Sequence, residues 1–463
     1  MPVAGTRQPG GLLNRLRLKP EPIDRVLGPF HRFIETECSA GIVLLASAVA
    51  ALVWANSQWS AQYHSLWDTE LTVALVGPTA FAFEIAESLR AWVNHALMAL
   101  FFFVVGLEIK REVLVGELSS RRQAALPVTA ALGGMLVPAL LFLVVNRGGE
   151  VRGWGVPMAT DIAFAVGILA LAGGRVPLAA KVFLMAFAIA DDIGATLVIA
   201  LFYTEHVSLN ALALAGCLLA VMAYLNWAGV RNTLVYVLLA AGMWLAFMKS
   251  GVHPTISGIL AAMAIPARSR VSRVDLVASM RELLDRFEEA DTGRGGVLVN
   301  SEQRAMLEEI EHISFQGQTP LQRIQHIVHP WVSFVVMPLF ALANAGVPLR
   351  DAGALAEPVT LGIVLGLVIG KPLGIVAFAW LAVKAKLAAL PASVTWRHIL
   401  ALGALGGVGF TMSLFVAGLA YEAPGPHAMA KVGILAGSLI SGVLGLLLLR
   451  RLSVTTPRAP ASG

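Results

Sequence analysis

Charged side chains are scarce in this sequence. Aspartate, glutamate, lysine and arginine make up 14% of its 463 residues, whereas 57% are hydrophobic. Soluble globular domains carry about 25% charged residues. A chain with so few charges cannot hide its apolar surface inside one water-soluble core, and its mean hydropathy of +0.75 agrees. The composition therefore argues against an ordinary soluble domain and predicts a membrane protein.

Cysteine is also almost absent. Cys38 and Cys217 are the only two, one at the expected border of a span and one inside a span. This pattern predicts neither a disulfide framework nor a cysteine metal site. A cleavable signal peptide is not expected either, because residues 1–37 are mostly polar and basic and no small-residue cleavage site follows the first apolar run.

Long apolar runs dominate the chain instead. A membrane-spanning helix needs roughly 20 mainly apolar residues. The run 71–83 is interrupted by Pro78 and flanked by Glu84, which indicates an interfacial or hairpin segment. The sequence thus predicts an all-α membrane protein with about twelve transmembrane helices, near 39–56, 93–109, 123–146, 155–172, 178–203, 209–227, 233–248, 251–267, 329–346, 358–383, 399–421 and 428–449.

The spans fall into two blocks separated by a polar loop. We expect five parts: an N-terminal segment (1–37), spans 1–8 (38–267), a loop (268–325), spans 9–12 (326–450) and a tail (451–463). The loop has two stretches with apolar residues at helical spacing, which indicates surface helices. A linker is the simplest interpretation of this loop, and a regulatory contact is the alternative.

Lysine and arginine are distributed unevenly among the connections. The connection after the second span holds Lys110, Arg111, Arg121 and Arg122, whereas the connections on the opposite side hold fewer basic residues. Cytoplasmic loops carry such an excess. An even number of spans then places both termini in the cytoplasm. The pI of about 9.4 reflects this topology and contact with anionic lipid, so we expect the bilayer as partner and no nucleic acid.

Two spans contain helix interruptions at corresponding places. In the fourth span Pro157 comes just before Thr160 and Asp161, and in the eleventh GALGGVGFTMS crowds four glycines together. Spans 3–5 and 10–12 share this layout, which predicts inverted repeats with discontinuous spans 4 and 11 crossing near the bilayer centre. Paired interruptions of this kind indicate the binding site of a transporter.

The motif AIADDIGA places Asp191 and Asp192 about ten residues into a span. Ionisable groups inside a membrane are expensive and are functional candidates by default. Two close carboxylates in a low-dielectric environment resist ionising together, so one can hold a proton near neutral pH. A hard cation such as Na⁺ also prefers oxygen ligands. A helix end at this position is the alternative, although apolar sequence continues on both sides.

Two further polar features lie inside predicted spans. Thr160 and Asp161 follow a helix break, where a carboxylate can neutralise exposed helix N-termini and a hydroxyl can ligate or cap. The alternative is a simple cap in the membrane interface. Lys371 in VIGKPLG has about ten apolar residues on each side, so its ammonium group needs a buried partner. The aspartates of span 5 and the C-terminal ends of broken helices are the candidates.

A charged cluster follows the second span in GLEIKREV. Glu108, Arg111 and Glu112 belong to it, and His326 and His329 near the ninth span titrate in the physiological range. A solvated helix end is one interpretation of this cluster. A cation funnel or a pH-responsive cluster is the other.

Eight runs of residues resemble one known family in that family's order. They are FFFVVGLEIKRE, MATDIAFAVGILAL, AIADDIGA, ALFYTE, KSGVHPTISG, HPWVSFVVMPLFALANAG, GKPLG and GFTMSLFVAGLA. Together they are similar to the NhaA-type sodium/proton antiporters over roughly residues 35–450. The resemblance implies a twelve-span fold whose fourth and eleventh spans unwind and cross.

The resemblance also implies roles for the buried residues. Asp192 would be the main carrier of Na⁺ and H⁺, and Asp191 beside it would pair with Lys371 and take part in the proton exchange. Thr160 and Asp161 would lie at the crossed chains, with Asp161 compensating the helix ends. The transported ions would be Na⁺, Li⁺ and H⁺, with no further cofactor.

Regulation and assembly follow from the same resemblance. Glu108, Arg111 and Glu112 would belong to a cytoplasmic pH-sensing region, for which His326 is a further candidate. Gln325 stands where the family pattern carries a glutamate. The family is electrogenic, works in sodium and pH homeostasis in the bacterial inner membrane, and is commonly dimeric, with the dimer contact expected in 57–91.

Other classes of protein share some of these features. A sodium-coupled symporter or a cation channel also needs buried oxygen ligands. Intramembrane aspartyl hydrolases use two membrane aspartates, but these come from separate helices, one of them in a GxGD setting. No GxGD occurs here, and adjacent residues on one helix cannot face each other across a scissile bond. We therefore expect a transporter and not an enzyme.

Overall fold

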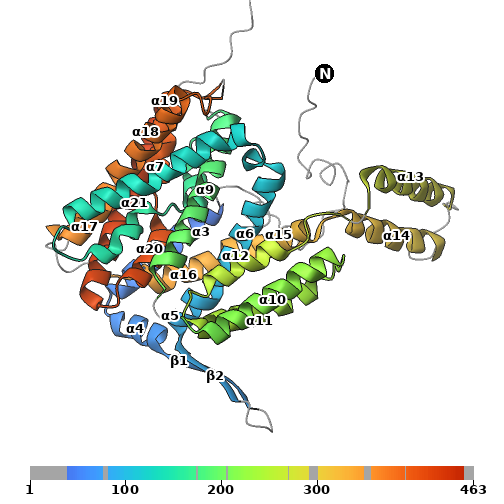
Figure 1. The fold of residues 1–463 in the computed structure, drawn as a ribbon, viewed down its shortest axis with the longest axis horizontal. Coiled ribbons are helices and arrows are strands. Elements are labelled where there is room, and N and C mark those ends of the chain that lie inside the picture. The colour runs from blue at the N-terminus through green and yellow to red at the C-terminus, as the bar shows by residue number, and fades with distance from the viewer. Residues whose placement is uncertain are drawn as a thin grey trace, which may run out of the picture.

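The computed structural model describes residues 39–76, 82–173, 176–204, 207–269, 271–290, 301–348, 356–391 and 393–452. Within them the chain is almost entirely helical, with one two-stranded sheet (Figure 1). The expected N-terminal segment 1–37 and residues 453–463 of the tail lie outside the described residues.

The first half of the chain contains the early spans, including the helix that carries Asp191 and Asp192. Its elements are α3 (Ser39–Ala55), α4 (Ser60–Asp68), β1 (Glu70–Val76), β2 (Ala82–Ser88), α5 (Leu89–Trp92), a π-helical turn (Val93–Leu97), α6 (Met98–Val115), a 3-10 turn (Glu117–Ser119), α7 (Arg121–Val145), a longer 3-10 segment (Val151–Met158), α8 (Ile162–Leu171) and α9 (Leu178–Phe202).

The second half contains two peripheral helices, the loop helices and the last spans. Its elements are α10 (Leu209–Trp227), α11 (Thr233–Ser250), α12 (Thr255–Ala264), α13 (Arg273–Glu289), α14 (Ser301–Gly317), α15 (Pro320–Trp331), a π-helical turn (Val332–Val336), α16 (Met337–Asn344), α17 (Pro358–Leu365), a π-helical turn (Gly366–Gly370), α18 (Lys371–Lys384), α19 (Trp396–Gly406), α20 (Phe410–Ala420) and α21 (Pro424–Arg451).

The described residues contain nine helices that are long and apolar enough to cross a membrane. Two bent pairs raise this number to eleven: α3 with α4, which meet at 114°, and α19 with α20, which meet at 47°. The short apolar helix α12 lies in the remaining predicted stretch, 251–267. The prediction of an all-α membrane protein is thus confirmed.

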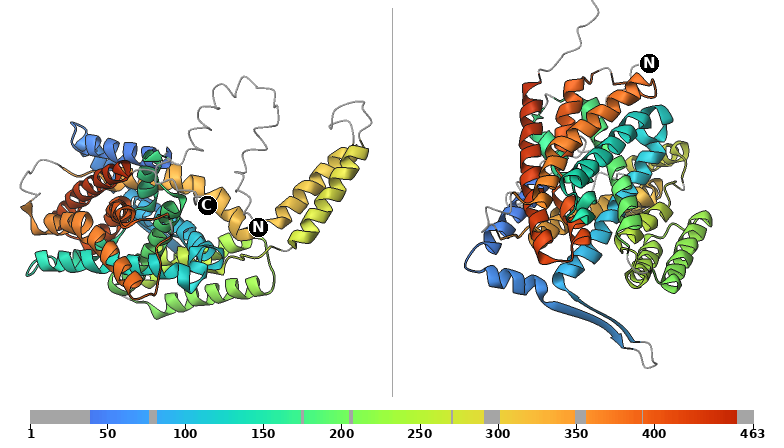
Figure 2. Two further views of the ribbon diagram at one scale, coloured as in Figure 1. Left: turned by 90° about the horizontal axis from the view of Figure 1, so that it is seen from above. Right: turned by 60° about the vertical axis from the view of Figure 1, so that its left-hand side comes forward.

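The two described parts of the interrupted run, 71–76 and 82–83, lie in paired antiparallel strands, and Pro78 lies outside the described residues. Strands β1 and β2 pair from Glu70 opposite Ser88 to Val76 opposite Ala82. The hairpin projects from the body beside α4 and α5 (Figures 1 and 2). Branched side chains such as Val73 and Ile85, which face each other across the strands, favour this extended conformation over a helix.

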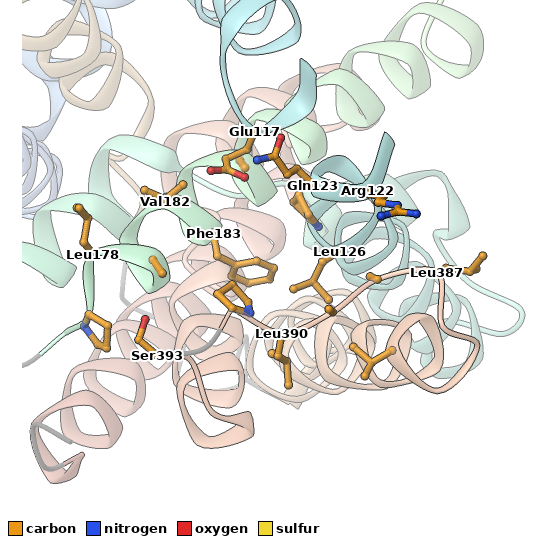
Figure 3. A pocket seen from close by; sticks show the side chains of 18 of the residues that line it. Glu117, Arg122, Gln123, Leu126, Leu178, Val182, Phe183, Leu387, Leu390 and Ser393 are labelled. Carbon is orange, nitrogen blue, oxygen red and sulfur yellow. The ribbon is translucent and has the colours of Figure 1, made fainter. Parts of the chain in front are cut away.

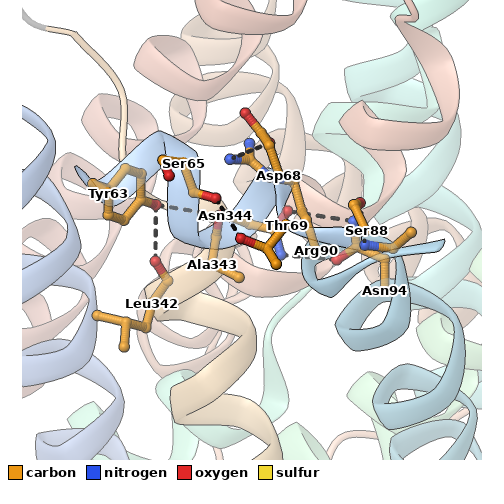
Figure 4. A network of polar contacts seen from close by, with 11 residues as sticks. Tyr63, Ser65, Asp68, Thr69, Ser88, Arg90, Asn94, Leu342, Ala343 and Asn344 are labelled. Atoms are coloured by element: carbon orange, nitrogen blue, oxygen red, sulfur yellow. Dashed lines mark hydrogen bonds and ion pairs between the residues drawn. The ribbon is translucent and has the colours of Figure 1, made fainter. Parts of the chain in front are cut away.

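Polar contacts fix the base of this hairpin to the bundle (Figure 4). The hydroxyl of Tyr63 donates to the carbonyl of Leu342 at 2.8 Å, and the amide of Asn344 donates to Asn94 Oδ1 at 2.8 Å. Arg90 Nη2 lies 3.4 Å from Asp68 Oδ1. Helix α4, the start of the second span and α16 are therefore tied together at this end of the molecule.

The loop between the two blocks of spans contains the two predicted surface helices. Helices α13 and α14 pack as a pair that stands away from the body (Figures 1 and 2). The Gln303 amide donates to the Phe287 carbonyl at 3.2 Å across the pair. Residues 291–300, which join the two helices, lie outside the described residues.

Glycine contacts between α7 and α18 set the geometry of the core. A Cβ on Gly133 would lie 2.2 Å from the Gly374 carbonyl oxygen, and one on Gly374 would lie 2.0 Å from the Gly133 oxygen. Small residues let membrane helices approach this closely. Because Lys371 is one turn before Gly374 on α18, this contact draws the lysine into the centre of the bundle, where it is 0% exposed.

Candidate ion-binding site

The two interrupted spans meet at their breaks. The 3-10 segment ends at Met158, the backbone is extended at Ala159 and Asp161, and α8 begins at Ile162. Pro157 lacks the N–H that a continuous helix would need. The Asp161 N–H donates to the Val408 carbonyl at 2.8 Å, between α19 and α20. A backbone hydrogen bond therefore joins the non-helical segments of spans 4 and 11 inside the bundle.

Asp161 caps two helices at once. Its Oδ1 accepts from the Phe164 N–H at 3.0 Å at the start of α8. Its Oδ2 accepts from the Thr411 N–H at 3.2 Å at the start of α20, and from the Thr411 hydroxyl. The carboxylate is 1% exposed. A negative charge between two helix N-termini is stabilised by both dipoles, so Asp161 holds the half-helices of the two spans together.

Lys371 compensates the opposite end of the broken span. Its Nζ lies 2.8 Å from Asp191 Oδ2 and also donates to the Met158 carbonyl, the last of the 3-10 segment. Asp191 and Lys371 are both 0% exposed. The sequence offered two kinds of partner for this lysine, and the structure places both beside it. Thr160 is another polar neighbour of Asp191, and its hydroxyl donates to the Gly406 carbonyl at 2.9 Å.

Asp192 is placed differently from its neighbour. It is 1% exposed, and neither of its carboxylate oxygens has a hydrogen-bond partner among the described residues. Four charged groups act on it electrostatically: the acids Asp191, Glu108 and Asp161, and the base Lys371. A buried carboxylate without partners is costly unless it binds a proton or a cation. The site can therefore hold either one.

The charged cluster of the second span lies near this site. Glu108 Oε1 is 3.9 Å from His329 Nε2, and Arg111 and Gln325 are its other polar neighbours. Glu112 instead accepts from the Glu117 N–H at 2.7 Å.

The two histidines that the sequence singled out differ in their surroundings. Both are exposed, but none of the described ion pairs joins His326 to Glu108. The structure thus brings Glu108 to His329 and not to His326.

A cavity of about 1350 Å³ lies away from these residues (Figure 3). It is found where α7 and α9 begin and α18 ends, and Leu126, Val182, Phe183 and Leu387 are among its mainly apolar lining. None of the buried aspartates lines it. The cavity is therefore not the ion site.

Two residues beside the site were not singled out from the sequence. Thr411 bonds Asp161 from the other broken span. Thr196 lies one helical turn after Asp192, and its buried hydroxyl has no hydrogen-bond partner among the described residues. Its spacing of four residues from Asp192 is the signal that could have drawn attention to it.

Half-helices that meet around buried carboxylates and a buried lysine are typical of membrane transporters. Comparison with known proteins identifies the kind of transporter. The family model described as Na⁺/H⁺ antiporter 1 matches residues 31–449. The chain belongs to this family of NhaA sodium/proton antiporters, and the resemblance of its sequence motifs to that family is confirmed.

Curated relatives agree with the family model. The chain is 50% identical over 434 residues to the Na(+)/H(+) antiporter NhaA of Oleidesulfovibrio alaskensis, which covers 93% of this chain and 95% of that protein. It is 46% identical over 441 residues to NhaA of Acidithiobacillus ferrooxidans, covering 94% and 100%. It is 44% identical over 427 residues to NhaA of an Escherichia coli strain, covering 91% and 97%.

Proposed function

We propose that this antiporter exports Na⁺ in exchange for H⁺ by competition at Asp192 and Asp191. The observation that carries the proposal is the difference between the two carboxylates. Asp191 is paired with Lys371 at 2.8 Å, whereas both oxygens of Asp192 are buried without a hydrogen-bond partner among the residues that the structure describes. Asp192 is thus the carboxylate that is free to take a cation or a proton.

Competition makes the exchange obligatory. Na⁺ at Asp192 leaves the pair of Asp191 and Lys371 intact. Protonation of Asp191 weakens that pair and releases Lys371, and protonation of Asp192 displaces Na⁺. If the site changes access only when it holds Na⁺ or H⁺, the movement of one ion in one direction requires movement of the other ion in the opposite direction. Because both carboxylates take part in proton binding while one holds Na⁺, more protons than sodium ions move, and the cycle is electrogenic.

The crossed spans are the element that changes access. Lys371 contacts both Asp191 and the Met158 carbonyl at the break of span 4. Loss of the lysine contact leaves that carbonyl without its cation. Asp161 still neutralises the helix N-termini on the other side of the break, so the charges on the two sides are no longer balanced. A change of ion at the aspartates is thereby coupled to the position of the half-helices.

We also propose that this chain has the regulation, substrate range and assembly of its family. Glu108 and His329, with Arg111, Glu112 and the further candidate His326, sense pH. Li⁺ is a substrate in addition to Na⁺. The halves are inverted repeats, and the protein resides in the bacterial inner membrane with both termini in the cytoplasm. It forms a homodimer, for which the projecting hairpin offers paired strands with exposed Leu71 and Val73.

The test uses proteoliposomes or everted vesicles with an imposed pH gradient. Na⁺, Li⁺ or K⁺ is added, and collapse of the gradient is followed by dye fluorescence for the wild type and Asp192→Asn. We expect Na⁺-dependent dequenching that vanishes in the variant. Absence of dequenching from about pH 6 to 9 with folded protein would favour a symporter or a channel. Conductance without saturable exchange would identify the channel, and a required co-substrate would identify the symporter.

A further inference from the structure

Among the described residues, the hydroxyl of Thr196 makes no hydrogen bond, and it lies one helical turn after Asp192. The two residues are four positions apart on α9, which places them about 40° apart around the helix and about 6 Å apart along it. Thr196 Oγ1, Asp192 Oδ1 and Asp192 Oδ2 are all buried, and none has a hydrogen-bond partner in the part of the chain that the structure describes.

Threonines in helices ordinarily use their hydroxyl locally. The hydroxyl donates to the carbonyl three or four residues earlier, which satisfies it without help from another helix. Thr129 in α7 does so, donating to the Ala125 carbonyl at 2.6 Å. Thr204, just after α9, donates to the Ala200 carbonyl at 2.9 Å. Thr196 does not make this bond, so its hydroxyl remains available for another partner.

The neighbours of α9 show where this hydroxyl lies. Gly194 faces Met135 of α7, and Ile189 belongs to the small cluster that packs on Val105 of α6. By helical geometry Thr196 is about 160° from Gly194 and about 20° from Ile189 around the axis. Its side chain therefore points away from α7, and around the helix axis its direction falls between those of Asp192 and Ile189.

The other hydroxyls around the crossing are already engaged. Thr160 donates to the Gly406 carbonyl at 2.9 Å, Thr411 donates to Asp161, and Ser413 donates to the Val156 carbonyl at 2.7 Å. Each of these bonds joins the two broken spans. Of these four hydroxyls, only that of Thr196 is on the same helix as Asp192, and it makes none of the bonds that join the two broken spans.

We propose that Thr196 supplies a neutral oxygen ligand to the Na⁺ or Li⁺ bound at Asp192. This inference rests on the proposed function, in which Asp192 is the cation carrier. A hard cation that enters a buried site exchanges its water for protein oxygens, and one carboxylate does not provide enough of them. The threonine oxygen offers a lone pair to the cation. When Asp192 is protonated instead, the same oxygen accepts a hydrogen bond from the acid.

Substitutions that keep the shape of the side chain test the role of the hydroxyl. Thr196→Val replaces it with a methyl group, and Thr196→Ser keeps it. Thr129→Val is the matched control, because it removes a hydroxyl that bonds only its own helix. The apparent KM for Na⁺ and Li⁺ is measured by dequenching at one pH, and binding of ²²Na⁺ is measured directly on purified protein.

We expect Thr196→Val to raise the apparent KM and the Kd for Na⁺ roughly fivefold, as for the loss of one polar contact. Maximal dequenching should be kept, and Thr196→Ser and Thr129→Val should match the wild type. Wild-type KM and Kd in Thr196→Val would overturn the inference, and so would equal shifts in the valine and serine variants. If the valine variant unfolds in detergent, Thr196→Ala takes its place.

Asp192→Asn separates the two proposals. If this variant still binds ²²Na⁺ and exchanges it, the proposed function fails and Thr196 loses its role with it. If Asp192→Asn abolishes both activities while Thr196→Val leaves KM and Kd unchanged, only the inference about Thr196 is wrong.

Discussion

Lys371 and Asp191 form a fully buried ion pair, with 2.8 Å between Nζ and Oδ2, across 180 residues of sequence. A buried pair of charges adds little net stability compared with apolar residues, but removal of one partner leaves the other uncompensated. In the proposed mechanism the pair therefore links the stability of the protein to ion exchange.

Removal of Lys371 should destabilise the protein. We expect Lys371→Ala to lower the free energy of unfolding by about 3–5 kcal/mol, because Asp191 is left as an unpaired buried charge. The double variant Asp191→Asn with Lys371→Gln should recover most of the loss. Thermal unfolding in detergent measures both. Lys384→Ala, which removes an exposed lysine over Trp380, is the control and should unfold like the wild type.

The proposed electrogenic mechanism makes a separate prediction for the same lysine. In a Lys371→Ala variant that still folds, exchange should no longer depend on membrane potential. The reason is that, in the proposed mechanism, uptake of the extra proton by Asp191 is coupled to release of Lys371. Exchange in proteoliposomes with and without an imposed potential is the measurement. Electrogenic exchange that survives in this variant would show that the pairing is unnecessary.

Loss of the double cap at Asp161 should cost more than loss of an ordinary cap. Asp161→Ala removes acceptors from the starts of both α8 and α20, so we expect about 2–4 kcal/mol of destabilisation, twice the upper range for one cap. Asn232→Ala removes the single cap of α11 and should cost about 1 kcal/mol. Chemical unfolding in detergent compares them, and equal losses would argue against the double role.

The contact between α7 and α18 leaves no room for a methyl group. We expect Gly133→Ala to destabilise the protein by about 1–3 kcal/mol or more and to weaken exchange, because the helices must separate and carry Lys371 with them. Gly418→Ala in α20 is the control, because its added methyl would meet no atom within 4 Å. Thermal unfolding and dequenching are read together. A Gly133→Ala variant as stable as the control would refute this account of the packing.

Response to pH should depend on His329 more than on His326. The contact between His329 and Glu108 is an ion pair only while the imidazole is protonated and the carboxyl is ionised, so it is lost as pH rises. If it restrains α6 against α15, His329→Gln should start exchange at a lower pH, and His326→Gln should leave the profile unchanged. Dequenching from about pH 6 to 9 measures this. Equal shifts in both variants would exclude a specific role for the pair.

Much of this architecture could be predicted from the sequence because its rules are local. A span needs a long apolar run, and a charge inside such a run is expensive, so the runs and the exceptional Asp191, Asp192 and Lys371 stand out by themselves. The break in span 4 was equally visible, because Pro157 and the residues after it do not continue a helix. The identification of the family rests on the same short motifs in order.

Only the tertiary structure decided which of these groups meet. Asp161 caps α20, 250 residues further along the chain, and Glu108 lies beside His329 although His326 is nearer to it in sequence. The unused hydroxyl of Thr196 likewise became visible only when the partners of its neighbours were known. The physical reason is that lipid and protein neighbours are equally apolar, so the sequence of a span does not show which face it turns inward. Helix packing makes that choice, and with it the chemistry of the site.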